Sequence, residues 1–418
     1  MFLKAMPYQP EVGSEEDAGI IAIVRQAGEI SRLQLMRRTG LSRTAVTARL
    51  SSLLEQGLIE EVGVGLSNGG RPPTLVRFAK EAGYVVGIDL GATSLDVAVT
   101  NLNAEPLVHT AQEMYVRDGP ELIMPSIKKA VEGALDQAGI DRSSVKGIGM
   151  GVPGPVEFST GRPVAPPLMP GWHLYPIRDY LESAFNWPIY VDNDVNIMAL
   201  GELWSGIGQN IQNFIFVKIG TGIGCGIVCQ GEIYRGADGS AGDIGHIAVG
   251  DDTTVCRCGN VGCLEAVAGG WAIGRMAERI AREGISETLA RRLQEAGSLT
   301  AVDVSAALSD GDPVVIEVVR QAGQAVGRVL AGIVNFYDPS LIIIGGGVAK
   351  VGDLLLAAIR ETVYRRSLPL ATRHIMLRAT SLGDDAGVVG AAAMVLGKQY
   401  KLTPIGAAAG GSQSGRLR

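Results

Sequence analysis

The chain contains 418 residues, of which 46% are hydrophobic, and it carries a formal net charge of −6 at neutral pH. This length predicts roughly two or three domains with sizeable cores. No run reaches the roughly 18 consecutive apolar residues that a membrane span requires, which excludes a transmembrane protein and gives no reason to expect a membrane partner. The N-terminal segment MFLKAMPYQPEVGSEED lacks the apolar stretch of a secretion signal, and five cysteines make no disulfide framework. We therefore expect a cytoplasmic protein.

Residues 1–80 differ from the remainder of the chain in charge and in pattern. They hold ten Lys/Arg and eight Asp/Glu, whereas the rest holds 27 and 35. Apolar residues recur at helical spacing up to Gly28, a second helix is expected between Ser31 and Gly40, and Ser42 is the expected cap of a third. The expected apolar contacts are Leu33, Leu35 and Met36 in the second helix and Val46, Leu50, Leu53 and Leu54 in the third.

This order of helices is typical of a helix-turn-helix domain, in which the third helix enters the major groove of DNA. The segment LIEEVGVGLSNGGRPPTLVRFA then predicts two short strands around a glycine-rich turn, a wing that would present Arg71 to a narrow minor groove. We therefore predict a winged helix-turn-helix domain over residues 1–80. The residues expected to contact DNA are Ser42, Arg43, Thr44, Thr47, Arg49, Ser51 and Arg71. A helical hairpin used for dimerisation, with Arg71 merely solvated, is the alternative.

From Tyr84 onward, apolar strands alternate with helices rich in alanine and glycine, which indicates an α/β architecture. Several strands run directly into glycine-rich or acidic turns, as in KGIGMGVPGPV, PIYVDNDVNIMALGE, FIFVKIGTGIGCGIV and LIIIGGGVAK. An earlier turn, Gly91 to Ser94, could bring backbone N–H groups against a phosphate, but it could equally be a plain hairpin. The later turns can converge on one cleft.

The segment GHIAVGDDTTVCRCGNVGCLEA combines one histidine with three cysteines at a spacing that can close a tetrahedral zinc site. The predicted ligands are His246, Cys256, Cys258 and Cys263. This set leaves no open position for a catalytic water, so the zinc is expected to be structural and to hold the flanking Asp243 and Glu265 in place. Disulfides are the alternative, which a reducing compartment disfavours. The remaining cysteines, Cys225 and Cys229, lie in an apolar run and are expected to be buried thiols.

A series of motifs occurs in a fixed order: IDLGATS, GVPGPV, VDNDVN, GTGIGCGI, GSAGDIGHI, CRCGNVGCLEA and NFYDPSLIIIGGGVA. They resemble the ROK family (repressors, open reading frames and sugar kinases) over about residues 15–398, and the N-terminal domain resembles that of its repressor branch. The resemblance implies a two-lobed, actin-like and ribonuclease-H-like ATPase fold, with a sugar site between the lobes, assembled as a homodimer or homotetramer. The first lobe would comprise residues 84–195, completed by a helix at 384–400. The second, with the zinc loop and the oligomer interface, would comprise 196–383. A disordered tail is expected at 401–418.

The resemblance also implies a sugar site and a nucleotide site. The residues that match the sugar-contacting set are Asn193, Asp194, Asp243, His246, Glu265, Gly151, Pro153 and Gly154. In the kinase members the residue that matches Asp194 acts as general base on the accepting hydroxyl. A carboxylate that merely stabilises a helix N-terminus is its alternative role. The residues that match the nucleotide loops are Gly91, Thr93, Gly220, Thr221, Gly222 and Gly346.

Two departures from the family pattern bear on activity. The kinase motif Asp-x-Gly-Gly-Thr-Lys is replaced by Asp-Leu-Gly-Ala-Thr-Ser, in which Ala92 adds a Cβ near the phosphate position and Ser94 supplies no positive charge. Asp243 stands where the kinases and many repressors have glutamate, and its shorter side chain changes the reach toward a sugar hydroxyl. We therefore expect no phosphoryl transfer, and neither ATP nor Mg²⁺ as a cofactor.

Taken together, these patterns predict a sugar-responsive transcriptional repressor without enzymatic activity. Its expected partners are double-stranded operator DNA and a small sugar or sugar-phosphate effector, and its expected cofactor is structural Zn²⁺. Binding of the effector must favour one arrangement of the lobes, because a ligand with equal affinity for both arrangements shifts neither. The alternatives are an ATP-dependent hexose or N-acetylhexosamine kinase with an appended DNA-binding domain, and an interaction scaffold that binds no sugar.

Overall fold

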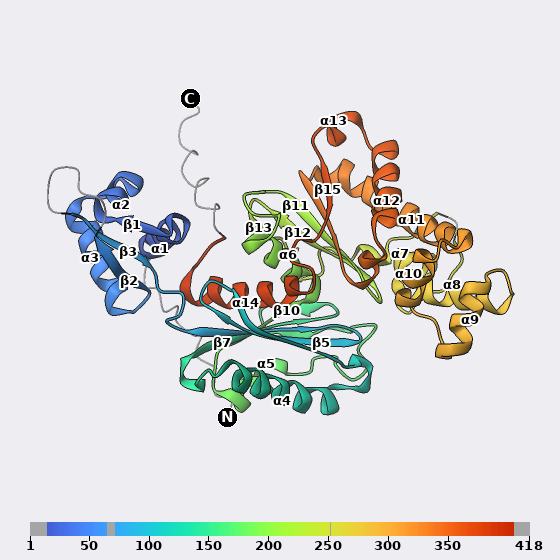
Figure 1. The fold of residues 1–418 in the computed structure, drawn as a ribbon, viewed down its shortest axis with the longest axis horizontal. Helices are drawn as coiled ribbons and strands as arrows, with labels where there is room; N and C mark the ends of the chain where they lie inside the picture. The colour runs from blue at the N-terminus through green and yellow to red at the C-terminus, as the bar shows by residue number, and fades with distance from the viewer. Residues whose placement is uncertain (1–14, 65–71, 251, 405–418) are drawn as a thin grey trace.

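The computed structural model describes residues 15–64, 72–250 and 252–404, which form a small N-terminal domain beside two larger α/β lobes (Figure 1). This arrangement confirms the expected α/β class with an N-terminal winged helix. Within the described ranges, no helix is both long and apolar enough to cross a lipid bilayer. The tip of the predicted wing, with Arg71, and residues 405–418 of the predicted tail lie outside the described residues.

The N-terminal domain packs its helices against a sheet in the order β1-β3-β2. Its elements are α1 (Glu15–Ala27), β1 (Glu29–Ser31), α2 (Arg32–Thr39), α3 (Arg43–Glu55), β2 (Ile59–Val64) and β3 (Thr74–Phe78). Gly28 and Gly40 follow α1 and α2 with φ of +71° each, a left-handed conformation that glycine adopts without steric cost. The prediction that Leu33 is a core contact is wrong, because its side chain is 54% exposed. Leu33 lies two residues before the buried Leu35, about 200° around the helix, and so faces away from the core.

Replacing Ser31 by alanine is expected to weaken α2. The Ser31 hydroxyl accepts the N–H of Gln34 at 3.3 Å, and the Gln34 side chain accepts the N–H of Ser31 at 2.9 Å, a reciprocal cap. Loss of such a cap costs about 1 kcal/mol, so the α2 amides should exchange with deuterium about fivefold faster. Ser31→Thr keeps the hydroxyl and serves as the control. Equal exchange in Ser31→Ala and the wild type would contradict the role of the cap.

The first lobe is built on a five-stranded sheet in the order β10-β7-β4-β5-β6, in which β10, β7 and β4 are parallel. Its elements are β4 (Tyr84–Leu90), β5 (Ser94–Asn101), β6 (Pro106–Glu113), η1 (Val116–Asp118), α4 (Pro120–Ala138), η2 (Arg142–Ser144), β7 (Val145–Val152), β8 (Val156–Glu157), β9 (Arg162–Pro163), α5 (Ile177–Phe185) and β10 (Ile189–Asn193). Helices α4 and α5 cover one face of this sheet, and α14 (Asp385–Tyr400), from the end of the chain, covers the other (Figure 1).

The second lobe contains a five-stranded sheet in the order β13-β12-β11-β14-β15, flanked by helices. Its elements are β11 (Phe214–Ile219), β12 (Ile223–Cys229), β13 (Glu232–Ile233), η3 (Ile244–His246), α7 (Leu264–Ala268), α8 (Gly270–Arg282), α9 (Glu287–Ala296), α10 (Ala301–Ser309), α11 (Pro313–Tyr337), β14 (Leu341–Gly345), η4 (Gly347–Val351), α12 (Asp353–Arg366), α13 (Pro369–Thr372) and β15 (Met376–Ala379). Buried aliphatic side chains from β11, β14, α8, α11 and α12 form its core.

Helix α6 (Asp194–Ser205) links the two lobes, because it follows β10 of the first sheet and packs against β11 and β12 of the second as well as α14. The α6–α14 crossing depends on glycines, which have no side chain to separate the two helices. A Cβ added to Gly390 would lie 1.6 Å from the carbonyl oxygen of Ile197, and one on Gly201 would lie 2.2 Å from that of Ala386. The two helices therefore approach each other closely at Gly201 and Gly390.

Candidate functional site

Helix α3 presents the predicted DNA-reading surface. Ser42 is its N-cap, with the hydroxyl accepting the N–H of Ala45 at 3.2 Å, and Ser42, Arg43, Thr44 and Ser51 are exposed. Thr47 is half-buried, and its hydroxyl donates to the carbonyl oxygen of Arg43 at 2.7 Å. On the opposite side the helix buries its aliphatic residues Val46, Leu50 and Leu53. The exposed turn is therefore free to face a major groove, as the sequence predicts.

Arg49 is placed differently from the other predicted DNA contacts. Its side chain is half-buried and forms ion pairs with Glu16 and Asp17 of α1, the latter at 3.5 Å. The guanidinium thus ties α3 to α1 within the domain, and a contact with a phosphate would compete with these carboxylates.

The four predicted zinc ligands come together in the second lobe. Their donor atoms, one from each of His246, Cys256, Cys258 and Cys263, all lie within 4.8 Å of one another. The sulfur atoms of Cys258 and Cys263 are 3.7 Å apart, and Cys256 Sγ is 3.7 Å from Nδ1 of His246. Zinc–sulfur bonds of about 2.3 Å in a tetrahedron place neighbouring donors about 3.8 Å apart, so the donor set and its spacing fit zinc.

The residues on either side of this cluster supply acidic groups. Asp243 is exposed and directly precedes η3, and Glu265 lies on the first turn of α7, two residues after Cys263. Glu265 Oε2 accepts the N–H of Ile223 at 3.1 Å, and a Cβ on Gly222 would lie 2.2 Å from the same oxygen. Burial raises the pKa of Glu265 above its ordinary value, although the Ile223 N–H and then His246 lower it in part. The glycine-rich turn after β11 therefore packs directly against the zinc loop.

At the start of α6, the structure separates the roles of two adjacent predicted residues. Asn193 caps the helix by accepting the N–H of Val195 at 2.9 Å, and its Nδ2 donates to the carbonyl oxygen of Gly154 at 2.9 Å. Asp194 makes no cap; its Oδ2 pairs with Nζ of Lys218 at 2.6 Å, with side-chain exposures of 6% and 18%. Asn193 is therefore the N-cap of α6, while Asp194 lies in the first turn of the helix, where a carboxylate also stabilises the N-terminus.

Two positively charged side chains at this site were not predicted from the sequence. Lys218 interrupts the apolar strand β11, and a lysine in such a run is a signal that could have identified it. Arg235 donates to Oδ2 of Asp192 at 2.7 and 2.9 Å and lies over the Phe158 ring at 3.9 Å. No sequence pattern marked the Arg235–Asp192 pair, because the two residues come from different lobes.

The three predicted residues on the far side of the sugar site lie close to α6. A Cβ on Gly151 would lie 2.2 Å from Cδ1 of Ile197 and 3.2 Å from Cα of Asp194, so only glycine fits there. Pro153 and Gly154 follow β7 and are half-buried, and the Gly154 carbonyl is held by Asn193. The predicted sugar residues thus come from β7, β10, α6, η3 and α7, around the ends of β11 and β12.

The predicted nucleotide loops form tight turns. Gly91 donates its N–H to the carbonyl oxygen of Ser94 at 2.8 Å, which closes the β4–β5 hairpin and leaves Thr93 exposed at its tip. The carbonyl oxygens of Gly220 and Thr221 accept N–H groups from the start of α8 at 2.8 and 3.4 Å. Gly346 has φ of +89° beside Ile219. A Cβ on Gly222 or Gly346 would lie 2.2 Å from Glu265 Oε2 or 2.6 Å from the Ile219 carbonyl oxygen, whereas a Cβ on Gly220 would make only ordinary contacts.

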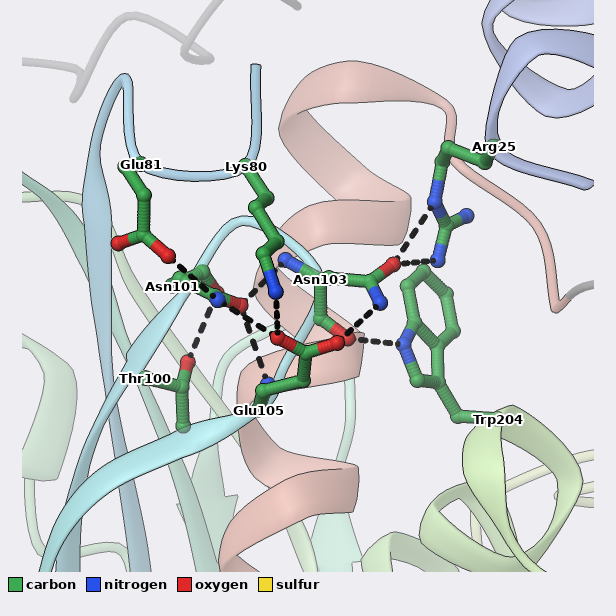
Figure 2. A network of polar contacts seen from close by, with 8 residues as sticks. All are labelled: Arg25, Lys80, Glu81, Thr100, Asn101, Asn103, Glu105 and Trp204. Atoms are coloured by element: carbon green, nitrogen blue, oxygen red, sulfur yellow. Dashed lines mark hydrogen bonds and ion pairs between the residues drawn. The ribbon is translucent and has the colours of Figure 1, made fainter. Parts of the chain in front are cut away.

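A third group of polar residues joins the N-terminal domain to the lobes (Figure 2). Arg25 of α1 is 8% exposed; it donates to Oδ1 of Asn103 at 2.8 and 3.1 Å and to the carbonyl oxygen of Thr403 at 2.8 Å, and lies over the Trp204 ring at 4.7 Å. Trp204 Nε1 donates to the Asn103 carbonyl oxygen at 3.0 Å. Arg25 therefore contacts the β5–β6 turn, the last turn of α6 and the segment after α14.

This junction contains a buried positive charge, that of Arg25, and a cavity beside it. Burial lowers the pKa of Arg25 to about 10, partly offset by Glu105, so the guanidinium remains protonated near neutral pH. A cavity of about 230 Å³ opens beside Arg25 and Trp204. Although residues 401–418 were predicted to be a disordered tail, Leu402 is 4% exposed and Thr403 binds Arg25, so the described start of that segment is part of the junction. The sequence offered no signal for this contact.

Comparison with known proteins places these features in a family. Residues 85–398 match the ROK family, and residues 17–60 match winged helix-turn-helix DNA-binding domains. The chain is 32% identical over 367 residues to a putative xylose repressor from Caldicellulosiruptor sp. (strain Rt8B.4), covering 88% of this chain and 92% of that protein.

Two solved structures share the architecture. A ROK family transcriptional regulator described as a homologue of the E. coli MLC protein superposes with a TM-score of 0.79 and 26% identity, covering 94% of this chain and 98% of that one. A ROK family glucokinase from Streptomyces griseus, in complex with glucose and AMPPNP, superposes with a TM-score of 0.68 and 32% identity, covering 75% and 99%. The family match spans most of the chain, and the N-terminal match adds a DNA-binding module. This protein is therefore a member of the ROK family with an N-terminal winged helix-turn-helix domain.

Proposed function

We propose that this protein is a transcriptional repressor whose affinity for operator DNA is set by a small sugar bound in its ROK domain. The observation that carries the proposal is the pairing of Asp194 with Lys218, in a chain whose α3 exposes a capped N-terminal turn. A general base must contact the substrate hydroxyl whose proton it accepts, whereas Oδ2 of Asp194 is engaged by Nζ of Lys218 at 2.6 Å. The similarity to a putative xylose repressor over 88% of the chain supports the same function.

The sugar would bind between Asn193 and Asp194 on one side and Asp243, His246 and Glu265 on the other. Carboxylates accept hydrogen bonds from adjacent sugar hydroxyls, and a partner left unpaired by the wrong epimer costs about 1–3 kcal/mol, so such a set can discriminate between sugars. Zinc bound by His246 and the three cysteines would fix the loop that carries these groups. With Nδ1 of His246 directed at the cysteines, Nε2 is the nitrogen left for the sugar.

The DNA would be read by two copies of α3, because a two-fold oligomer matches an operator with two half-sites. An apolar surface suited to a second copy lies on α11 to α13, where Phe336, Leu368 and Leu370 are 93%, 68% and 75% exposed. The N–H of Leu368 donates to Oδ1 of Asn335 at 3.0 Å, which brings these side chains to one region of the second lobe. We assign the homodimer contact to this region.

The sugar would reach the DNA-binding domain through α6. This helix begins with Asp194 in the sugar site and carries Trp204 in its last turn, against Arg25 of α1. A change in lobe arrangement that moves α6 therefore acts directly on the contact that orients the winged helix. The sugar-preferred arrangement would misplace the two recognition helices and release the DNA.

The test begins with genomic fragments retained by the full-length protein, whose affinity is then titrated with D-xylose, D-glucose and N-acetyl-D-glucosamine. We expect one of these sugars to change the affinity for a retained fragment by about tenfold, and Arg43→Ala to weaken retention. Fragment binding that no sugar alters would contradict sugar control. ADP release from ATP in the presence of a sugar, abolished by Asp194→Asn, would favour the kinase alternative, which the glucokinase-like fold recommends as the second candidate.

A further inference from the structure

Lys218 is a charged residue in an otherwise apolar strand, and the functions assigned so far do not explain it. It lies on β11 among Phe214, Phe216 and Ile219, which are fully or almost fully buried. An ammonium removed from water without a partner is strongly unfavourable, so its position needs a compensating charge. Asp194 supplies that charge at 2.6 Å.

A second carboxylate lies within electrostatic reach of the same ammonium. Asp89, at the end of β4 in the predicted first phosphate loop, is 5% exposed, and its Oδ1 has no hydrogen-bond partner among the described residues. Burial raises the pKa of Asp89 to about 7, with Lys218 opposing the shift and Asp194 adding to it. Burial alone would lower the pKa of Lys218, but Asp194 and then Asp89 raise it above its ordinary value. Both carboxylates therefore interact with one cation.

These residues do not fit a divalent cation such as the Mg²⁺ that accompanies ATP in kinases. Mg²⁺ requires oxygen ligands at about 2.0–2.1 Å in near-octahedral geometry. The ammonium of Lys218 already engages Oδ2 of Asp194, one of the two oxygens that a metal could use, and its positive charge repels a second cation.

We propose that Lys218 is a built-in cation of the sugar cleft: its ammonium neutralises Asp194 and partly offsets the charge of Asp89, where a divalent metal would otherwise be needed, so that the protein binds its sugar without metal or nucleotide in the cleft. The claim that the protein binds a sugar in this cleft rests on the proposed function. The claim that Lys218 excludes a divalent cation concerns only Lys218 and the two carboxylates. Lys218 is on this view a positioning residue, which fixes the Asp194 carboxylate through the contact of Nζ with Oδ2.

The experiment compares the full-length, zinc-loaded wild type with Lys218→Met, which has a similar length and no charge. Mn²⁺ serves as the spectroscopic probe, with free Mn²⁺ measured by electron paramagnetic resonance. We expect Lys218→Met to bind one Mn²⁺ per chain in this cleft. Its affinity for this ion should be about tenfold higher than that of the wild type. The double variant Lys218→Met/Asp194→Asn should lose this gain, and Lys218→Arg, which keeps the charge, should not acquire it.

Calorimetry with D-xylose, D-glucose and N-acetyl-D-glucosamine provides the second measurement. The sugar that binds the wild type should bind Lys218→Met about tenfold more weakly, because Asp194 loses its charged partner. Added Mg²⁺ should restore much of that affinity in the variant and leave the wild type unchanged. Unaltered melting temperature and zinc content establish that Lys218→Met folds; if it does not, Lys218→Gln, which also lacks the charge, replaces it.

Equal Mn²⁺ uptake by the wild type and Lys218→Met would overturn the proposal, as would sugar binding by the wild type that requires Mg²⁺. If none of the sugars binds the wild type, the proposed function fails, and the Mn²⁺ comparison still decides whether Lys218 excludes a metal. The two failures are therefore distinguishable.

Discussion

Cys263→Ser is expected to lose bound zinc and to weaken sugar binding by about tenfold or more. The loop between η3 and α7 has little regular structure, with isolated bridges that pair Ala248 with Cys263 and Val255 with Val261. Without the metal, the loop would be held by backbone hydrogen bonds such as those from Val249 N–H to Gly262 O and from Cys256 N–H to Asn260 O, each at 2.8 Å. Glu265 lies two residues beyond Cys263, so release of the loop also frees its carboxylate from the N–H of Ile223. Zinc content by mass spectrometry and sugar affinity by calorimetry measure the two effects.

The matched control is Cys229→Ser, since Cys229 is a half-buried free thiol outside the cluster. It should retain one zinc per chain and the wild-type sugar affinity. Sugar affinity that survives complete loss of zinc in Cys263→Ser would separate the metal from the sugar site and contradict the structural role given to it.

Arg25→Met is expected to abolish most of the effect of sugar on DNA binding while each ligand still binds. Methionine keeps the apolar stem over Trp204 but loses the hydrogen bonds to Asn103 and Thr403. The coupling free energy between two sites is reciprocal, so DNA should likewise cease to alter the affinity for sugar. We expect the factor by which sugar changes DNA affinity to fall from about tenfold to below about twofold.

Both affinities are measured by fluorescence anisotropy and calorimetry, each with and without the other ligand. Arg142→Met removes a comparable arginine whose ion pair with Glu132 lies on the surface of the first lobe, and it should leave the coupling intact. An Arg25→Met protein that still releases DNA on sugar binding would show that the signal takes another route.

Features encoded by residues close in sequence were predictable. The caps at Ser31 and Ser42 follow from their position before a helical pattern, and both accept the expected backbone N–H groups. The cluster of one histidine and three cysteines was predictable for the same reason, because its four residues lie within 18 positions, from His246 to Cys263. Such short spacings constrain geometry before any tertiary structure is known.

Contacts between distant residues were not predictable in the same way. Arg25 is 78 residues from Asn103 and 378 from Thr403, and no local pattern relates them. Lys218 and Asp194 are only 24 residues apart, yet their pairing depends on how α6 packs against β11. A charged side chain in an apolar strand needs a partner, so the position of Lys218 in β11 predicts that one exists but not which residue it is.

Helix α6 has a mechanical consequence. Its twelve residues span about 18 Å, and a hydrogen-bonded helix of this length moves as a stiff lever. If sugar binding tilts its first turn by about 10°, its last turn swings by about 3 Å, comparable to the reach of a hydrogen bond. Such a displacement would strain the contacts that Arg25 makes with Asn103, Trp204 and Thr403. A small rotation of α6 near the effector would thus release the whole N-terminal domain from the lobes as one rigid unit, without any change in its internal structure.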